Sequence, residues 1–131
     1  GGNEQKTIKM KGKLGRREIL ILIDSGSTHC FLNEKFTETL GIQTTGAPLT
    51  VNVANGEKLE SRQLQKMVGW DIQGHDFHHQ FNTLRLGNCD IVLGVDWLAK
   101  YSPIEFDFKQ ITMKSLKGKE LVVLKRRNRE A

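Results

Sequence analysis

Apolar and polar side chains alternate in short runs along most of this chain, the pattern of β-strands with one buried face. The first run covers residues 7–11, and the glycines within 12–15 predict a turn after it. Residues 17–24 are then expected to return as the second strand of a hairpin. Their central part, 19–23, is apolar without interruption, which predicts a strand buried on both faces.

Further strands are expected at 49–53, from 58 toward 70, and at 75–84, 90–94, 104–108, 111–113 and 121–124. Asn55-Gly56 predicts a two-residue hairpin turn, because both central positions of a type I′ turn need a positive φ. A second turn is expected near Gln73-Gly74. The pattern therefore predicts an all-β domain, of the many-stranded kind that forms closed barrels or sandwiches.

Two short helices are the exceptions to this strand pattern. Residues 33–40 have Asn33 as an N-cap and Gly41 as a stop signal, and 95–101 carry apolar residues at helical spacing before Pro103. Asp96 would lie in the first turn of the second helix, where the helix dipole favours a carboxylate. The expected class is thus all-β with one or two short helices.

The length of 131 residues suits one domain. We expect an N-terminal extension over 1–6, whose two leading glycines are consistent with a cloning remnant, a domain over 7–124, and a basic tail over 125–131. With a hydrophobic fraction of 37% and a mean hydropathy of −0.43, the core is modest. No apolar run approaches the roughly 18 residues that span a bilayer, and no secretory signal is visible. An intracellular, cytoplasmic protein without a membrane partner is expected.

The tetrapeptide Asp24-Ser25-Gly26-Ser27 is the main candidate for chemistry. A carboxylate at the mouth of a buried strand needs pairing, hydrogen bonding or protonation, so Asp24 is a candidate catalytic acid. Aspartic peptidases need two carboxylates that share one proton. The chain has a single Asp-Ser-Gly, and a symmetric homodimer would bring Asp24 to its own copy.

Three further segments, 53–57, 89–98 and 106–108, accompany the segment 21–29 around this motif. Together and in this order they resemble the retropepsins, and among these the proteases of plant gypsy-type LTR retrotransposons. The resemblance implies a retropepsin-like closed barrel that forms half of a bilobal site, completed by homodimerisation. It also implies an endopeptidase that cleaves a gag–pol-like polyprotein, within virus-like particles if the chain comes from a retrotransposon.

By the same resemblance, Asp24 is the catalytic acid, and Ser25, Gly26 and Ser27 shape the active-site loop. The hairpin tip at Ala54, Asn55 and Gly56 would be the flap that closes over a bound peptide. Leu93 and Gly94 would support the loop from beneath. Retroviral members carry an Asp where this chain has Thr28 and an Arg where it has Val95, so the ion pair that those residues form near the dimer interface is absent here.

Other groups of polar residues are weaker candidates for a catalytic or metal site. His75, His78 and His79, with Cys89 further on, lack the paired spacing of structural zinc sites, so no metal or other cofactor is expected. A triad of Ser27, His29 and Asp24, or a thiol pair of Cys30 with His29, is too close in sequence for the required geometry. The two cysteines, Cys30 and Cys89, are expected to be reduced thiols.

Two alternatives to an endopeptidase remain. The first is a non-catalytic retropepsin-like domain for dimerisation or peptide binding. The second is a nucleic-acid-binding β-barrel that uses the basic run 125–129, which contributes to a net charge of +5. No aromatic residue is interleaved with that run as a stacking platform would need, so nucleic-acid binding is not expected.

Overall fold

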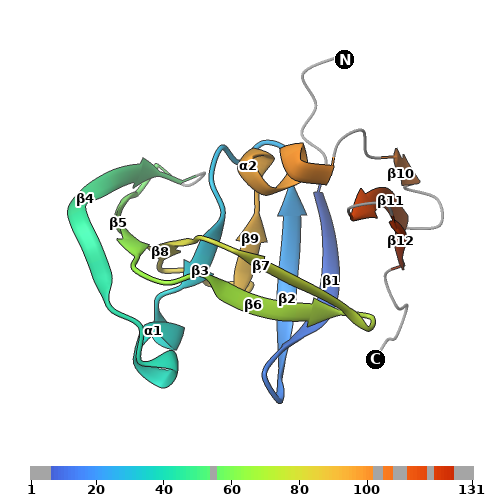
Figure 1. Cartoon of the computed structure of the whole chain (residues 1–131). Coiled ribbons are helices and arrows are strands. Elements are labelled where there is room, and N and C mark those ends of the chain that lie inside the picture. The colour runs from blue at the N-terminus through green and yellow to red at the C-terminus, as the bar shows by residue number, and fades with distance from the viewer. Residues whose placement is uncertain (1–6, 54–55, 102–104, 108–111, 118–119, 126–131) are drawn as a thin grey trace.

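The computed structural model describes residues 7–53, 56–101, 105–107, 112–117 and 120–125. Within these residues the chain forms mostly strands, with two short α-helices and one 3-10 helix (Figure 1). In chain order the elements are β1 (Thr7–Leu14), β2 (Arg17–Asp24), β3 (Phe31–Asn33), α1 (Lys35–Leu40), β4 (Thr44–Asn52), β5 (Lys58–Leu64), β6 (Val68–Ile72), β7 (His75–His79), β8 (Asn82–Leu84), β9 (Ile91–Leu93), α2 (Val95–Leu98), η1 (Ala99–Tyr101), β10 (Glu105–Asp107), β11 (Thr112–Lys117) and β12 (Glu120–Lys125). The predicted mostly β class is confirmed.

Nine of these strands form one curved sheet in the order β4-β5-β8-β3-β9-β2-β1-β6-β7, and β10-β11-β12 form a separate small sheet. The large sheet is open, with β4 and β7 as its described edges, so the expected closed barrel is not formed. The segments expected as continuous strands at 58–70 and 75–84 are each broken in two. The first segment gives β5 and β6, and the second gives β7 and β8. β5 and β8 lie near the β4 edge of the sheet, whereas β6 and β7 lie at its other end, so the sheet curves without closing (Figure 1).

The hairpin of β1 and β2 is the regular centre of the sheet. Its register pairs Thr7 with Asp24 and Leu14 with Arg17, so the turn is shorter than expected and Gly12 lies inside β1. The prediction that 19–23 is buried on both faces is wrong. One face of β2 is buried in the core, whereas its other face, with Leu20 and Leu22, is only half-buried.

The connections agree with the sequence in part. Gln73 and Gly74 both have positive φ, 52° and 85°, and form the predicted turn between β6 and β7. At the β4–β5 hairpin, Val53 N–H donates to Glu57 O at 3.0 Å, and Gly56 N–H donates to Val53 O at 2.9 Å. Gly56 has the positive φ of 88° there, and residues 54–55 lie outside the described residues.

Both helices are short. α1 ends as predicted at Gly41, which has φ 66°, but Glu34 rather than Asn33 is the residue before its first turn, because Asn33 still belongs to β3. In the described part of the chain, neither helix has the length and apolar content that crossing a membrane would require.

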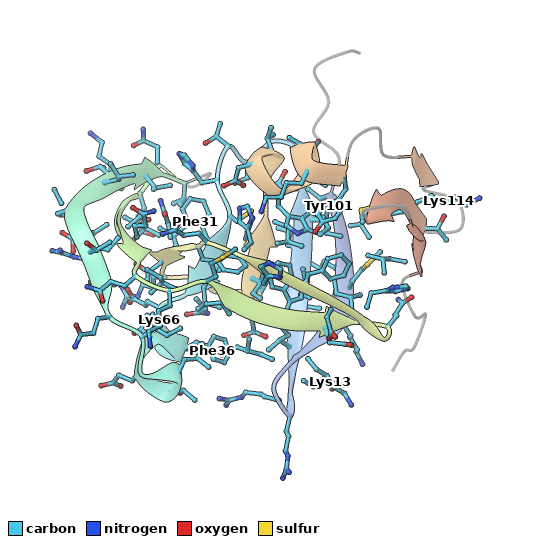
Figure 2. All side chains as sticks on the ribbon, viewed as in Figure 1. Lys13, Phe31, Phe36, Lys66, Tyr101 and Lys114 are labelled. Atoms are coloured by element: carbon cyan, nitrogen blue, oxygen red, sulfur yellow. The ribbon has the colours of Figure 1, made fainter. Side chains whose placement is uncertain are left out.

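An aromatic cluster fixes α2 on the sheet. The ring of Trp97, which is fully buried, meets the ring of Phe77 edge-on at 5.5 Å, and Trp70 stacks on Phe77 at 5.8 Å. Tyr101 of η1 adds a contact with Trp97 at 4.8 Å. Aromatic pairs in these geometries each contribute about 0.5–1.5 kcal/mol beyond their buried area. The helix that follows β9 is therefore held firmly against β6 and β7. Figure 2 labels Tyr101 among the side chains of this region.

We predict that Gly12→Ala destabilises the fold. A Cβ at Gly12 would lie 2.6 Å from the carbonyl oxygen of Asp71 and 2.7 Å from Cδ1 of Ile21, because β1 and β6 approach closely here. Overpacking of this kind costs about 1–3 kcal/mol in the free energy of unfolding, which urea denaturation would measure. Gly69→Ala in β6 is the matched control, since its Cβ would meet Phe77 O at an ordinary 3.5 Å. Equal stability of the two variants would contradict the close approach.

Candidate active site

The order of three strands creates the loop that carries Asp24. β9 lies between β2 and β3, parallel to β2 and antiparallel to β3. Because β2 and β3 are consecutive in the chain but are separated in the sheet, residues 25–30 must cross over the end of β9. Figure 1 shows this loop at the top of the molecule, above β9 and beside α2.

Asp24 is the last residue of β2 and is half-buried. Its Oδ1 accepts a hydrogen bond from Gly26 N–H at 2.8 Å, and its backbone oxygen accepts one from Ser27 N–H at 3.2 Å. Ser27 Oγ donates to the backbone oxygen of His29 at 2.7 Å, not to the imidazole, so the described geometry gives no serine nucleophile. These bonds close the loop upon itself and orient the carboxylate at its start.

Gly94 lies directly beneath this loop. A Cβ at Gly94 would come within 2.5 Å of the backbone oxygens of both Ser27 and His29, so only glycine fits. The next residue, Val95, donates its N–H to Ser27 O at 2.8 Å. Leu93, fully buried at the end of β9, leads into this contact. The segment after β9 is thereby hydrogen-bonded to the Asp24 loop.

A second polar cluster lies on the other side of Gly94. Cys30 Sγ accepts the N–H of Gly94 at 3.2 Å and donates to Asp96 Oδ1 at 2.8 Å. The other oxygen of Asp96 lies 3.3 Å from His79 Nε2, and His79 Nδ1 lies 2.9 Å from Lys100 Nζ. Burial, together with the neighbouring Asp96 carboxylate, raises the pKa of the Cys30 thiol far above its usual range. Burial opposes ionisation of Asp96, but the hydrogen bonds from Cys30 and His79 outweigh it and lower the pKa of that carboxyl.

Two hollows flank the loop. One, of about 740 Å³, has Leu22 and Cys89 in its wall, together with Leu59 of β5 and the segment after β8. The other, of about 450 Å³, lies between the loop residues 26–29 and the outer part of β4. A small apolar cluster of Phe31, Leu84 and Val92 with half-buried Leu22, Val51, Leu59, Leu86 and Cys89 lies along both hollows. Phe31 and Val51 line the second hollow, and the other members line the first. The β4–β5 hairpin therefore lines both hollows, and the first, whose wall includes Leu22 of the strand that ends in Asp24, forms a largely apolar groove.

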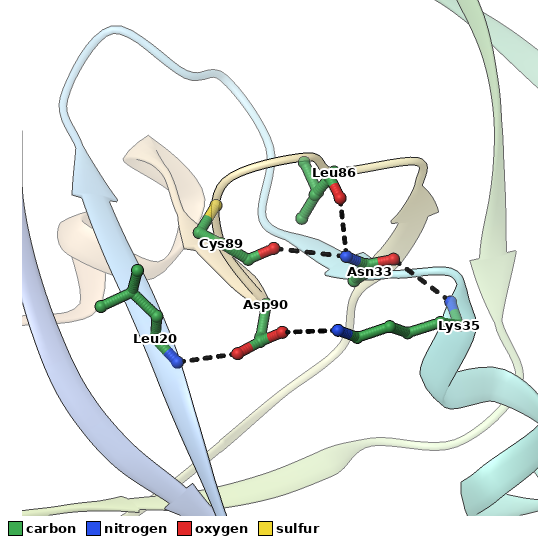
Figure 3. Close-up of polar contacts among 6 residues, drawn as sticks. All are labelled: Leu20, Asn33, Lys35, Leu86, Cys89 and Asp90. Atoms are coloured by element: carbon green, nitrogen blue, oxygen red, sulfur yellow. Dashed lines mark hydrogen bonds and ion pairs between the residues drawn. The ribbon is translucent and has the colours of Figure 1, made fainter.

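The far wall of that groove is held by the polar network in Figure 3. The buried side chain of Asn33 donates from Nδ2 to the backbone oxygens of Leu86 and Cys89, at 2.8 and 3.3 Å. Asp90 accepts the N–H of Leu20 at 2.8 Å and pairs with Lys35 Nζ at 3.3 Å. The segment between β8 and β9 is thus tied to both β2 and β3.

The structure brings together most of the residues that the sequence singled out. Ser25, Gly26 and Ser27 share the loop with Asp24, Gly94 lies below it, and Gly56 lies at the end of the overhanging hairpin. Ala54 and Asn55 lie outside the described residues. The three histidines and Cys89, whose spacing in the sequence argues against a metal site, do not share one face, because His78 is exposed on the opposite face of β7 from His79 and Cys89 lines the groove.

Sequence reasoning missed two sets of functional neighbours. One is the Asn33–Asp90 network, and the other is the group of Cys30, His79 and Asp96. The partners in both sets lie 17 to 70 residues apart in the chain and come from different elements. No local spacing could have revealed them, although a polar Asn beside two buried apolar residues in 31–33 is a weak signal of a buried hydrogen bond.

Comparison with solved structures supports the fold. The retroviral protease-like domain of Ddi1 from Leishmania major aligns with a TM-score of 0.65 and 13% identity, over 96% of this chain and 98% of that one. A retropepsin-like aspartic protease from Rickettsia conorii aligns with a TM-score of 0.53 and 15% identity, over 92% and 98%. No match was found among curated protein sequences. The family model described as retroviral aspartyl protease matches residues 15–119, and this chain belongs to that family.

Proposed function

We propose that this protein is an aspartic endopeptidase whose active site forms between two copies of the chain. The observation that carries the proposal is the position of Asp24. It lies at the start of a loop that is closed by its own hydrogen bonds and is flanked by two hollows. Leu22 lines one hollow and Gly26 the other. A carboxylate that follows a wall residue of one hollow and precedes a wall residue of the other is suited to activate water at the bond of a peptide that occupies both.

One carboxylate is insufficient for this reaction. In a dyad, the ionised carboxylate takes a proton from water while the protonated one donates to the substrate carbonyl oxygen. The sequence contains one Asp-Ser-Gly, so the second carboxylate would be Asp24 of another copy across a twofold axis. Gly26, exposed and without a side chain, would allow close approach at that axis.

The surface near the loop supports such a contact. Val95 is 46% exposed although it is apolar, and it lies beside the loop through its bond to Ser27. Thr28 is also exposed. Where retroviral relatives would use a charged pair, this chain would use an apolar and a hydroxyl side chain, so its dimer should be less sensitive to salt.

The proposed substrate is an extended polypeptide with apolar residues around the cleaved bond. The groove is lined by aliphatic side chains, which favour such residues. The β4–β5 hairpin could bind the substrate main chain as an added strand, a mode in which backbone hydrogen bonds supply affinity and side-chain pockets supply selectivity. The resemblance to retrotransposon proteases extends the proposal to a gag–pol-like polyprotein.

A non-catalytic domain for dimerisation or peptide binding is the second candidate. The Leishmania neighbour, which is described as a retroviral protease-like domain, leaves this reading open for the present chain. Both candidates predict binding of an extended peptide, but only the first predicts turnover.

Replacement of the carboxylate separates these candidates. With Asp24→Asn, cleavage of an unstructured peptide at mildly acidic pH should fall by about 100- to 10,000-fold or more, because the general acid–base group is lost. Peptide binding should persist. Asp76→Asn, an exposed carboxyl on β7, is the matched control and should retain full activity. Undiminished turnover by Asp24→Asn would refute the mechanism, and absence of turnover in the unmodified chain would favour the binding domain.

A mixing experiment tests the shared site. If unmodified and Asp24→Asn chains are refolded together in equal amounts, about one quarter of the dimers contain two intact carboxylates. Activity should then be about half of that given by the same amount of unmodified chain alone. Refolding with Asp76→Asn instead should increase activity. Activity that is unaffected by added Asp24→Asn would show that each copy works alone.

Substitution beneath the loop should lower the rate. Gly94→Ala would press a methyl group against two backbone oxygens and displace the loop that carries Asp24. A misplacement of about 1 Å can cost about 100-fold in rate, so kcat should fall at temperatures where the variant is still folded. Gly69→Ala serves again as the control. An unchanged kcat in folded Gly94→Ala would mean that the loop position does not matter.

A further inference from the structure

Cys30, His79 and Asp96 meet in space although they come from three separate segments. Cys30 precedes β3, His79 ends β7, and Asp96 lies in the first turn of α2. One donor atom of each, a sulfur, an imidazole nitrogen and a carboxylate oxygen, lies within 4.8 Å of the others. Cys30 is 1% exposed and His79 is 7% exposed, whereas the Asp96 carboxylate opens to solvent.

We propose that these three side chains bind a divalent transition-metal ion of the zinc class. Thiolate, imidazole and carboxylate are the three ligand types that zinc takes from proteins, at about 2.0–2.3 Å each. Donor atoms around one such tetrahedral ion lie about 3.3–3.8 Å apart, so side-chain rotations that move the donor atoms by about 1 Å are needed here. Three protein ligands leave the fourth tetrahedral position for water, on the open side beside Asp96.

Burial and Asp96 keep the metal-free thiol of Cys30 protonated, but one backbone donor would support a thiolate bound to a cation. Gly94 N–H already donates to Cys30 Sγ at 3.2 Å, and hydrogen bonds of this kind stabilise metal-bound thiolates from the outer shell. Binding would replace the hydrogen bond from the Cys30 thiol to Asp96, and the thiol proton would be released to solvent.

Lys100 must move for the ion to enter. Its ammonium lies 2.9 Å from His79 Nδ1, the nitrogen that would carry the proton when Nε2 binds a metal. Lys100 is exposed, so its side chain can turn into solvent.

A metal at this place would stiffen the site without taking part in its chemistry. It would join β7, α2 and the end of the Asp24 loop through side chains on either side of Gly94. Asp24 itself is not a ligand, so the metal site and the proposed peptidase activity stand or fall separately.

Cobalt is the direct probe, because a cysteine thiolate bound to Co²⁺ gives a charge-transfer absorption band that other ligands do not. The full chain, first treated with chelator and then dialysed, should develop this band at one equivalent of Co²⁺, and Zn²⁺ should abolish it by displacement. Zn²⁺ should also raise the thermal unfolding temperature in proportion to the logarithm of its concentration above Kd.

Matched variants locate the ligands. Cys30→Ser should lose the band, whereas Cys89→Ser, the other cysteine, should keep it. Loss of an outer-shell partner lowers metal affinity by about 10- to 100-fold, and His79→Gln, which removes a ligand, should lower the Co²⁺ affinity by more than that. The neighbouring His78→Gln should leave the affinity unchanged. Asp96→Asn should also lower the Co²⁺ affinity, and this variant should fold because Asp96 is exposed.

Two results would overturn the proposal. One is the absence of the thiolate band in the folded, reduced chain at millimolar Co²⁺, which would mean that the cluster is a hydrogen-bonded network only. The other is a band that survives Cys30→Ser or disappears in Cys89→Ser. If Cys30→Ser fails to fold, unchanged Co²⁺ affinity in the folded His79→Gln and Asp96→Asn variants would likewise overturn the proposal.

Discussion

The insertion of β9 between β2 and β3 is the constraint on which the rest of the site depends. It obliges the chain after Asp24 to cross over the end of β9, and it brings two backbone oxygens of the crossing loop against Gly94. Glycine is required there because any Cβ would collide with atoms that cannot move independently. The carboxylate at the start of the loop is therefore held by packing of backbone on backbone, which is stiffer than side-chain contacts.

The elements on either side of this crossing have complementary roles. α2 is anchored by Trp97 in an aromatic cluster, so the segment that begins with Gly94 has a fixed base. The β4–β5 hairpin, by contrast, is exposed along most of its length and is joined to the sheet mainly through β5 and β8. A rigid floor and a projecting arm together form a groove in which an extended peptide could be enclosed.

Local chemistry could be predicted wherever neighbours in sequence decide it. The β1–β2 hairpin, the turn at Gln73-Gly74 and the helix stop at Gly41 all follow from side-chain alternation or from positive φ. Predictions failed where tertiary pairing competes with local preference. Asn33 Oδ1 still accepts the N–H of Lys35 at 3.3 Å, but Asn33 belongs to β3 and its Nδ2 fixes the segment after β8, so the helix begins at Lys35 rather than directly after Asn33.

The sequence alone determined that an apolar strand ends in Asp24-Ser25-Gly26, and hence the candidate acid, whereas the family resemblance needed the further segments 53–57, 89–98 and 106–108. It could do so because a carboxylate after a buried strand is costly, and therefore informative, in any fold. Only the tertiary structure decided that the sheet stays open and that Cys30, His79 and Asp96 form one cluster. Those features depend on which strands become neighbours, and the free energy that selects the neighbours comes from burial summed over the whole domain.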